Sequence, residues 1–372
     1  MKQENWPRYF EAYAKTQFPS KLESDPWNYK HDLCMLGLDA LYTATGQACY
    51  LQAMLDARPY LLGDTGKIRH FSENEYNLDT ISFGKSLLLL YKRTQDARFL
   101  DAAMRCYGHL KEYPRTKSGG FYHKDIYPHQ IWLDGLYMAQ PFAAACEVQR
   151  GTFRFDDILR QFAGARAHLY VAETELYLHA WDESRTAAWA DPETGLSPSY
   201  WLRAEGWLLM ALCDCYELIS AHTPRAALLS TLLDEALSGL LPYRDKQSGM
   251  FLQVIDRAGV TGNYPETSGS AMVAYALLKG ARLGMIDKRY AQTGAELLKS
   301  IGDTCLREES GALRLDHICA SAGLGPGPDN RPDRDGTVRY YLSEAQIPDN
   351  EHGSGACMLA YAEALRAEGA DA

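Results

Sequence analysis

The sequence predicts an all-α fold, a closed toroid of six helical hairpins, from three observations. Apolar residues recur at helical spacing along most of the chain, and the alternating runs that are typical of strands are few and short. Similar segments follow one another, which is the signature of a repeat architecture. Several of the apolar segments are rich in Gly, Ala and Ser, and such small residues allow helices to converge around one axis. A closed ring is therefore favoured over an open solenoid.

Residues 36–57 and 83–106 show the repeat most clearly. Each has an apolar helix, a tyrosine, a threonine-containing turn and a second helix with a methionine near its end. The copies are about 49 residues apart, a spacing that suits one helical hairpin per repeat. Looser copies follow at residues 132–162, 203–237, 268–301 and 353–367, the last without its second half. No linker separates them, so residues 1–372 are expected to form a single domain.

Composition limits the function classes. The formal net charge is −10, which argues against a nucleic-acid or anionic-membrane partner, since both need clustered Lys and Arg. The nine cysteines include no CxxC pair, residues 1–10 lack the apolar core of a signal peptide, and no apolar run is long enough for a membrane span. A cytoplasmic protein is expected. The outer helices show no apolar stripe for a dimer, so we expect a monomer.

Long connections lie between the predicted hairpins. Loops of this length in a compact domain are usually functional, so they are expected to build a mouth at one end of the barrel. They contain Gly, Pro and aromatic residues and span residues 114–130, 181–198, 247–267 and 320–350.

One carboxylate is out of place in an apolar helical run. Asp134 follows Trp132 and Leu133 and precedes Leu136 and Tyr137. A buried carboxyl group that faces a pocket is a natural candidate to give and take protons. The alternative is that Asp134 flanks the start of the helix and is exposed to water.

Asp79 resembles Asp134 in context, because it also precedes a helix. Its alternative role is to cap that helix, since Asp followed by Thr80 and Ile81 is a good N-cap sequence. If both aspartates face the same mouth, the charge of Asp79 is expected to help hold Asp134 in its protonated form. Two carboxylates with different pKa values would supply an acid and a base.

Further polar and aromatic residues suit an anionic carbohydrate. Aromatic faces stack on sugar rings, while cations donate hydrogen bonds to hydroxyls and carboxylates. Taken singly, each Trp could be a core residue, and Arg203 could pair with a surface Glu. The candidates are His123, Lys124, His179, Trp201, Arg203 and Trp207.

Other reaction classes find little support. His123, Asp125 and His129 match no standard metal-ligand spacing, so no metal is expected. Residues 322–329 are glycine-rich but lack the setting and the Lys of a phosphate loop. Ser268, Ser270 and Ser354 lack the GxSxG elbow of serine hydrolases.

Taken together, the motifs resemble glycoside hydrolase family 105, the unsaturated rhamnogalacturonyl hydrolases, which are related to the unsaturated glucuronyl hydrolases of family 88. The resemblance extends over residues 27–360. Its most specific pieces are YNLDTISFGKSLL, GGFYHKDIYPHQIWLDGLYMAQPF, WADPETGLSPSYWLRAEGWLLMAL, QVIDRAGVTGNYPETSGSAMVAYALLKG, RDGTVRYYLSE and NEHGSGACMLA. The chain departs from the family pattern at Asp32, where Gly is usual, and at Glu205, where many members have Asn.

The resemblance implies an (α/α)6 barrel and a hydrolase that needs no metal or organic cofactor. It also implies that Asp134 is the catalytic acid and base and that Asp79 is its partner carboxylate. The implied substrate is an oligosaccharide with a terminal 4,5-unsaturated uronic acid. In the implied mechanism, Asp134 protonates C4 of this sugar and then activates the water that adds at C5. The implied substrate-contacting residues are Tyr29, His123, Lys124, His179, Trp201, Arg203 and Trp207.

Three alternatives remain open at this stage. The same chemistry could act on an unsaturated glucuronyl unit. A sugar epimerase could use the same barrel, but it requires paired histidines, and His123 with His179 meets that requirement only loosely. A binding scaffold of helical repeats is disfavoured by the long aromatic loops and by the acids within apolar helices.

Overall fold

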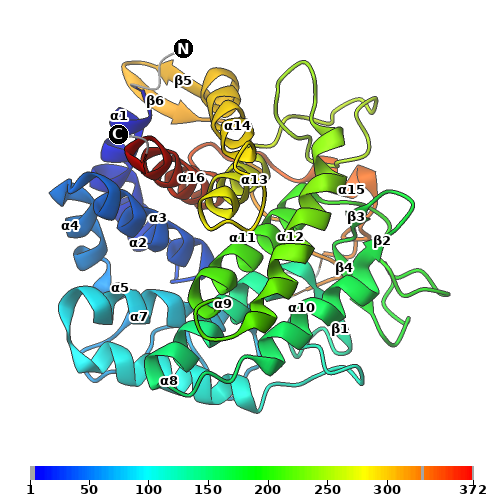
Figure 1. Ribbon diagram of the computed structural model, residues 1–372, viewed down its shortest axis with the longest axis horizontal. Coiled ribbons are helices and arrows are strands. Elements are labelled where there is room, and N and C mark those ends of the chain that lie inside the picture. The colour runs from blue at the N-terminus through cyan, green and yellow to red at the C-terminus, as the bar shows by residue number, and fades with distance from the viewer. Residues whose placement is uncertain (1–4, 328–330, 371–372) are drawn as a thin grey trace.

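Helices dominate the computed structural model of the protein, which describes residues 5–327 and 331–370 (Figure 1). The helices are α1 (Asn5–Ala12), α2 (Phe18–Ser24), α3 (Tyr29–Thr45), α4 (Ala48–Asp56), α5 (Arg58–Leu61), α6 (Leu78–Ile81), α7 (Phe83–Thr94), α8 (Ala97–Lys111), α9 (Leu133–Arg150), α10 (Asp156–Leu169), α11 (Leu202–Ile219), α12 (Ala227–Leu240), α13 (Thr267–Arg282), α14 (Tyr290–Cys305), α15 (Val338–Ser343) and α16 (Glu351–Ala370). The strands are β1 (Gln130–Trp132), β2 (Tyr170–Val171), β3 (Leu176–Tyr177), β4 (Ala180–Asp182), β5 (Leu306–Glu309) and β6 (Ala312–Leu315).

Six helices form an inner ring. In order around the ring they are α3, α7, α9, α11, α13 and α16, and α16 packs back against α3 to close it (Figure 1). The outer helices α4, α8, α10, α12 and α14 each pack against the inner helix that precedes them. Since each of the first five inner helices is followed by an outer helix that returns, the six inner helices run in the same direction. The prediction of a closed α/α toroid is confirmed.

The sixth hairpin is completed from the other end of the chain. The sequence copy at residues 353–367 lacks a second helix, and α1 lies against α16 in the place where an outer helix would be (Figure 1). The Phe10 ring packs on Tyr361 of α16 with ring centroids 5.6 Å apart, and Trp6 stacks on Phe10 at 5.3 Å. The buried aromatic residues of α1 therefore close the ring where the repeat runs out.

Small residues allow the inner helices to approach closely, as the sequence predicts. At the α3–α16 contact, a Cβ added to Gly37 would lie 2.8 Å from the Met358 Cβ. A Cβ added to Gly355 would lie 2.8 Å from the Leu33 Cγ. Any larger side chain at either position would push the two helices apart, because the core is already close-packed.

The long loops gather at one mouth of the barrel. They precede α9, α11, α13 and α16, so they lie at the N-terminal ends of these parallel inner helices. Strand β1 pairs antiparallel with β4, with Gln130 opposite Asp182 and Trp132 opposite Ala180, which joins two of the loops. The other ribbons are β2–β3 and β5–β6, both antiparallel. The predicted position of the loops is confirmed.

Two further findings concern the described residues. None of the described helices is both long enough and apolar enough to cross a membrane. All nine cysteines lie in the described part of the chain, and each of them is free.

Candidate active site

Asp134 lies in the first turn of α9 at the loop-bearing mouth. Its side chain is 13% exposed, and the His179 Nε2 atom lies 3.0 Å from its Oδ2 atom. The Leu133 amide donates a hydrogen bond of 3.0 Å to the His179 carbonyl, which holds the start of α9 beside the segment between β3 and β4. Asp134 therefore faces a histidine, and the alternative that it simply flanks the helix in water is wrong.

The pKa of Asp134 departs from the sequence-based expectation. Burial acts to raise this pKa, but the positive charge of His179 and the contact with it outweigh burial, so the pKa lies below its ordinary value. The expectation that Asp79 holds Asp134 protonated is therefore wrong for the free protein. The reason is that Asp134 has its own partner, while Asp79 pairs with Lys124 at 2.7 Å.

A tyrosine that was not singled out from the sequence fixes the ring of His179. The Tyr341 hydroxyl lies 2.7 Å from the His179 Nδ1 atom, and both side chains are fully buried. One ring nitrogen thus faces the hydroxyl and the other faces Asp134, so the orientation of the imidazole is set from both sides. Tyr341 lies in the motif RDGTVRYYLSE, but nothing in that motif distinguishes it from Tyr340.

Asp79 lies in the first turn of α6 and is paired with a cation. Asn77, not Asp79, caps α6, since its side chain accepts the Asp79 amide at 3.0 Å. The alternative role of Asp79 as an N-cap is therefore wrong. The Lys124 ammonium lies 2.7 Å from one Asp79 oxygen, and His123 Nε2 lies 3.8 Å from the other. The Leu78 amide donates to the His123 carbonyl at 3.1 Å, which brings the loop to α6.

The charges around Asp79 follow from burial and pairing. Burial lowers the pKa of His123 to about 4, against the opposing effect of Asp79, so His123 is neutral near pH 7. Burial also acts to lower the pKa of Lys124, but Asp79 outweighs it and the pKa is raised. Lys124 is therefore held as a cation beside Asp79, and His123 can act there near pH 7 only as a neutral donor or acceptor.

Aromatic rings line the space around the two aspartates. Trp132 stacks on His123 with ring centroids 4.5 Å apart and an angle of 12° between the planes, and it meets the ring of His179 edge-on at 5.2 Å. Trp201 packs on His179 at 4.8 Å and stacks on Tyr341 at 5.8 Å. Trp132 was not singled out as a site residue, although it precedes Asp134 by only two positions.

Arg203 is held rigidly in the first turn of α11. It is 1% exposed, so the interpretation as a surface ion pair is wrong. Its Nε donates to the Ser268 hydroxyl at 2.8 Å, and its Nη2 lies 3.4 Å from Glu266 Oε1 and donates to the Cys319 carbonyl. Among the described residues, the buried Nη1 atom has no hydrogen-bond partner. One arm of the guanidinium is thus left without a partner in the described part of the chain.

Tyr29 links the charged groups. Its hydroxyl lies 3.0 Å from the Nε2 atom of His352, a second site residue that sequence reasoning missed. Burial raises the pKa of Tyr29, the charges of Asp79 and Asp134 raise it further, and the charge of Arg203 acts to lower it.

Trp207 lies deeper than the other predicted residues. It is 1% exposed, stacks on Tyr137 at 4.8 Å and meets Tyr29 edge-on at 6.3 Å. The indole of Trp207 therefore packs against Tyr29 as part of the wall of the site. It is too buried to serve as an exposed platform on which a sugar could stack.

The two departures from the family pattern lie in the barrel frame. Asp32 accepts hydrogen bonds from Trp27 Nε1 at 3.1 Å and from the Ser86 hydroxyl at 2.6 Å, and burial raises its pKa. Glu205 accepts the Tyr177 amide at 3.0 Å, and burial raises its pKa to about 8, so it is mostly neutral near pH 7.

The residues weighed as metal ligands have other contacts. Asp125 accepts the Tyr76 amide at 3.1 Å, and His129 Nδ1 lies 3.0 Å from the Tyr122 hydroxyl. In residues 5–327 and 331–370, no group of three His, Cys, Asp or Glu side chains could hold a metal ion.

An α/α toroid with this mouth belongs to a recognisable class of protein. Two carboxylates, one of them paired with a histidine, supply acid–base groups, aromatic rings supply flat faces, and a buried arginine supplies a cation. The arrangement is typical of an enzyme that performs acid–base chemistry on a sugar.

Comparison with known proteins identifies the family. The model of Glycosyl Hydrolase Family 88 matches residues 4–368, and the chain therefore belongs to this family. A family 105 glycoside hydrolase from C. acetobutylicum is 37% identical, with a TM-score of 0.88 over 95% of this chain and 99% of that one. The resemblance found in the sequence is thereby confirmed. The protein is a glycoside hydrolase with a carbohydrate substrate, which favours hydrolysis over the epimerase and the scaffold.

Three other relatives are informative. Protein Atu3128 from Agrobacterium fabrum is 43% identical over 215 residues, 56% of this chain and 90% of its own length. Unsaturated rhamnogalacturonyl hydrolase YesR from Bacillus subtilis is 31% identical over 214 residues, 56% of this chain and 59% of its own length. The unsaturated glucuronyl hydrolase from Bacillus sp. GL1 shares the fold, with a TM-score of 0.67 at 14% identity over 91% of this chain and 86% of that one.

Proposed function

We propose that the protein removes a terminal 4,5-unsaturated galacturonyl residue from rhamnose in oligosaccharides produced by a lyase. The observation that carries the proposal is the contact of 3.0 Å between Asp134 and His179 in a mouth that also holds the free arm of Arg203. The similarity to YesR, whose name gives this substrate, supports the choice of sugar.

The substrate offers a definite reaction. Its terminal sugar has a C4=C5 double bond that is conjugated to the carboxylate and forms a vinyl ether with the ring oxygen. A proton delivered to C4 leaves positive charge at C5, shared with the ring oxygen. Water then adds at C5 and loses a proton, and the resulting hemiketal opens. The bond to the next sugar breaks as the ring collapses to a keto-uronic acid.

Asp134 is assigned both proton transfers, first as general acid and then as general base. In the free protein Asp134 is ionised beside His179, so the carboxylate must take up a proton before it can protonate C4. An approaching substrate carboxylate and a drier site both favour this protonation, because they disfavour the ionised Asp134. After the water has added, Asp134 takes a proton from it and is ready for the next turnover.

The remaining groups are assigned positions around this pair. The free Nη1 of Arg203 binds the uronate carboxylate, since a guanidinium donates well to that group. The ion pair Asp79–Lys124 orients the water and the sugar hydroxyls, and the buried rings of Trp132 and Trp201 hold His123 and His179 in place.

A second candidate is the same reaction on an unsaturated glucuronyl unit. The Bacillus sp. GL1 enzyme, which is named an unsaturated glucuronyl hydrolase, has the same fold and is the reason for this second candidate. At 14% identity, however, the similarity concerns the fold alone. The two sugars differ in the configuration of the unit they derive from and in the sugar that follows, so specificity must be measured.

The experiment supplies both unsaturated disaccharides and records two signals together, loss of the double-bond absorbance and release of the second sugar. Our proposal predicts faster turnover of the galacturonyl–rhamnose compound, with absorbance loss that never lags behind rhamnose release. Faster turnover of the glucuronyl compound would change the assigned substrate but would leave the proposed hydration mechanism intact. Rhamnose release that precedes the absorbance loss would refute hydration and indicate direct attack at the anomeric carbon.

A further inference from the structure

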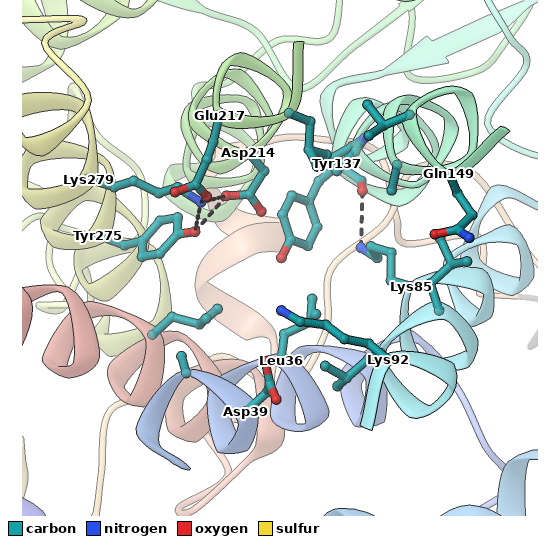
Figure 2. A pocket seen from close by; sticks show the side chains of 18 of the residues that line it. Leu36, Asp39, Lys85, Lys92, Tyr137, Gln149, Asp214, Glu217, Tyr275 and Lys279 are labelled. Carbon is teal, nitrogen blue, oxygen red and sulfur yellow. Dashed lines mark hydrogen bonds and ion pairs between the residues drawn. The ribbon is translucent and has the colours of Figure 1, made fainter. Parts of the chain in front are cut away.

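A cavity lies among the inner helices of the barrel, and Figure 2 shows side chains that line it. Its volume is about 570 Å³, within the range of small-molecule sites. All six inner helices line it, and apart from Lys85 of α7 the lining residues of these helices lie beyond the first turns, whereas the first turns of α9 and α11 carry Asp134 and Arg203. The apolar part of the wall includes Leu36, Leu88, Pro141, Leu218 and Leu359.

On one side of the cavity the acids are already neutralised. The Lys279 ammonium lies 2.7 Å from both Asp214 and Glu217, and the Tyr275 hydroxyl donates to Asp214 at 2.5 Å (Figure 2). Glu363 is paired in the same way with Arg282 at 2.7 Å. A cationic ligand would therefore find no free carboxylate on this wall.

On the other side a proline creates an unusual lysine environment. Pro141 lies within α9 and has no amide hydrogen, so it cannot donate to the Tyr137 carbonyl four residues earlier. The Lys85 ammonium makes that missing bond at 3.1 Å and lies 3.7 Å from the centroid of the Tyr137 ring (Figure 2). Lys85 is 8% exposed, so a buried positive charge borders the cavity.

Two further donors point into the same space. The Tyr137 hydroxyl is buried and has no hydrogen-bond partner among the described residues. Lys92 forms no ion pair with any described residue, and Figure 2 shows its side chain and the Tyr137 hydroxyl directed into the cavity. Free donors and positive charge therefore face an apolar chamber in which the acids are occupied.

We propose that this cavity is a binding site for a small amphiphilic anion, a carboxylate or sulfonate on an apolar body. The anionic group would accept hydrogen bonds from Tyr137 and Lys92, and the body would lie against the leucines of α3, α7, α11 and α16. The proposal rests on this cavity and is independent of the substrate assigned to the mouth.

The test uses 8-anilinonaphthalene-1-sulfonate, an aromatic sulfonate whose fluorescence rises in apolar surroundings, with the full-length protein. We expect saturable binding of one equivalent. Tyr137→Phe and Lys92→Gln should each weaken binding about 3- to 10-fold, because each removes one donor to a charged group. Lys288→Gln, at an exposed lysine that does not line the cavity, is the matched control and should leave binding unchanged.

Two further measurements complete the test. Ala145→Phe projects a ring from the half-buried wall into the cavity and should abolish binding while the circular dichroism spectrum is kept. The bound probe should be displaced by 4-phenylbutyrate and not by 4-phenylbutanol, which has the same body without the charge. Any of three results would overturn the proposal. These are probe binding by the Ala145→Phe variant, unchanged affinity in both donor variants, and equal displacement of the probe by the neutral alcohol.

Discussion

His179 Nε2 lies 3.0 Å from Asp134 Oδ2, and the opposite nitrogen of the same ring lies 2.7 Å from the Tyr341 hydroxyl. The carboxylate, the imidazole and the phenol thus form a chain in which the middle member is fully buried. We propose that this arrangement lets Asp134 hold or release one proton without moving, which is the property that the proposed two-step reaction demands.

The outer end of this chain can be tested with Tyr341→Phe. Removal of the hydroxyl leaves His179 Nδ1 without its partner, so the ring loses one of the two contacts that orient it. We expect kcat to fall about 10-fold with KM within a few-fold of the parent, together with a shift in the pH dependence of kcat. An unchanged pH profile would show that Tyr341 only fills space.

The substrate carboxylate is assigned to Arg203, and Arg203→Lys examines that role. Lysine keeps a positive charge beside Glu266 but cannot replace the forked guanidinium that bonds Ser268 and the Cys319 carbonyl. The expected result is a KM for the unsaturated disaccharide raised at least about 10-fold, measured by initial rates. A KM equal to that of the parent would return Arg203 to a purely structural role.

The bond between Lys85 and the Tyr137 carbonyl makes a prediction about stability. Lys85→Met should destabilise the fold by roughly 2 kcal/mol, since a buried carbonyl loses its charged donor. With Pro141→Ala, residue 141 regains an amide that can donate to that carbonyl, so the loss should shrink in the double variant. Chemical denaturation of the four proteins measures this coupling, and strictly additive effects would contradict it.

Acid stability follows from His123. Burial lowers its pKa to about 4, so between pH 6.5 and pH 4 the unfolded chain binds a proton that the folded chain does not. Stability is therefore lost as pH falls through this window, by about 1.4 kcal/mol for each pH unit at most. His123→Gln should show a smaller drop in Tm from pH 6.5 to pH 4 than the parent, and equal drops would contradict the assignment.

Much of the fold could be predicted because its signals are local. Helical periodicity, the repeated hairpins and the Gly-rich inner helices all appear within short windows of sequence, and the structure confirms them. The part played by α1 could not be found this way, because its contact with α16 joins residues at opposite ends of the chain, such as Phe10 and Tyr361.

Sequence reasoning picked out residues that the structure brings together, but it did not predict how they pair. Asp134 and Asp79 stand out as acids near helix starts, but the pKa of Asp134 depends on His179, which arrives from another loop. Tyr341 is 162 positions from His179 in the sequence, so no local pattern could indicate their contact.

The measurement that tests the central claim most directly compares turnover by Asp134→Asn with turnover by the parent. Turnover is monitored as the loss of the double-bond absorbance of unsaturated rhamnogalacturonan disaccharide. Asparagine fits the same space but cannot give or take the proton. Our account predicts a fall in kcat of at least about 10³-fold, with the circular dichroism spectrum and Tm close to those of the parent. A folded variant that keeps activity within a few-fold of the parent would contradict it.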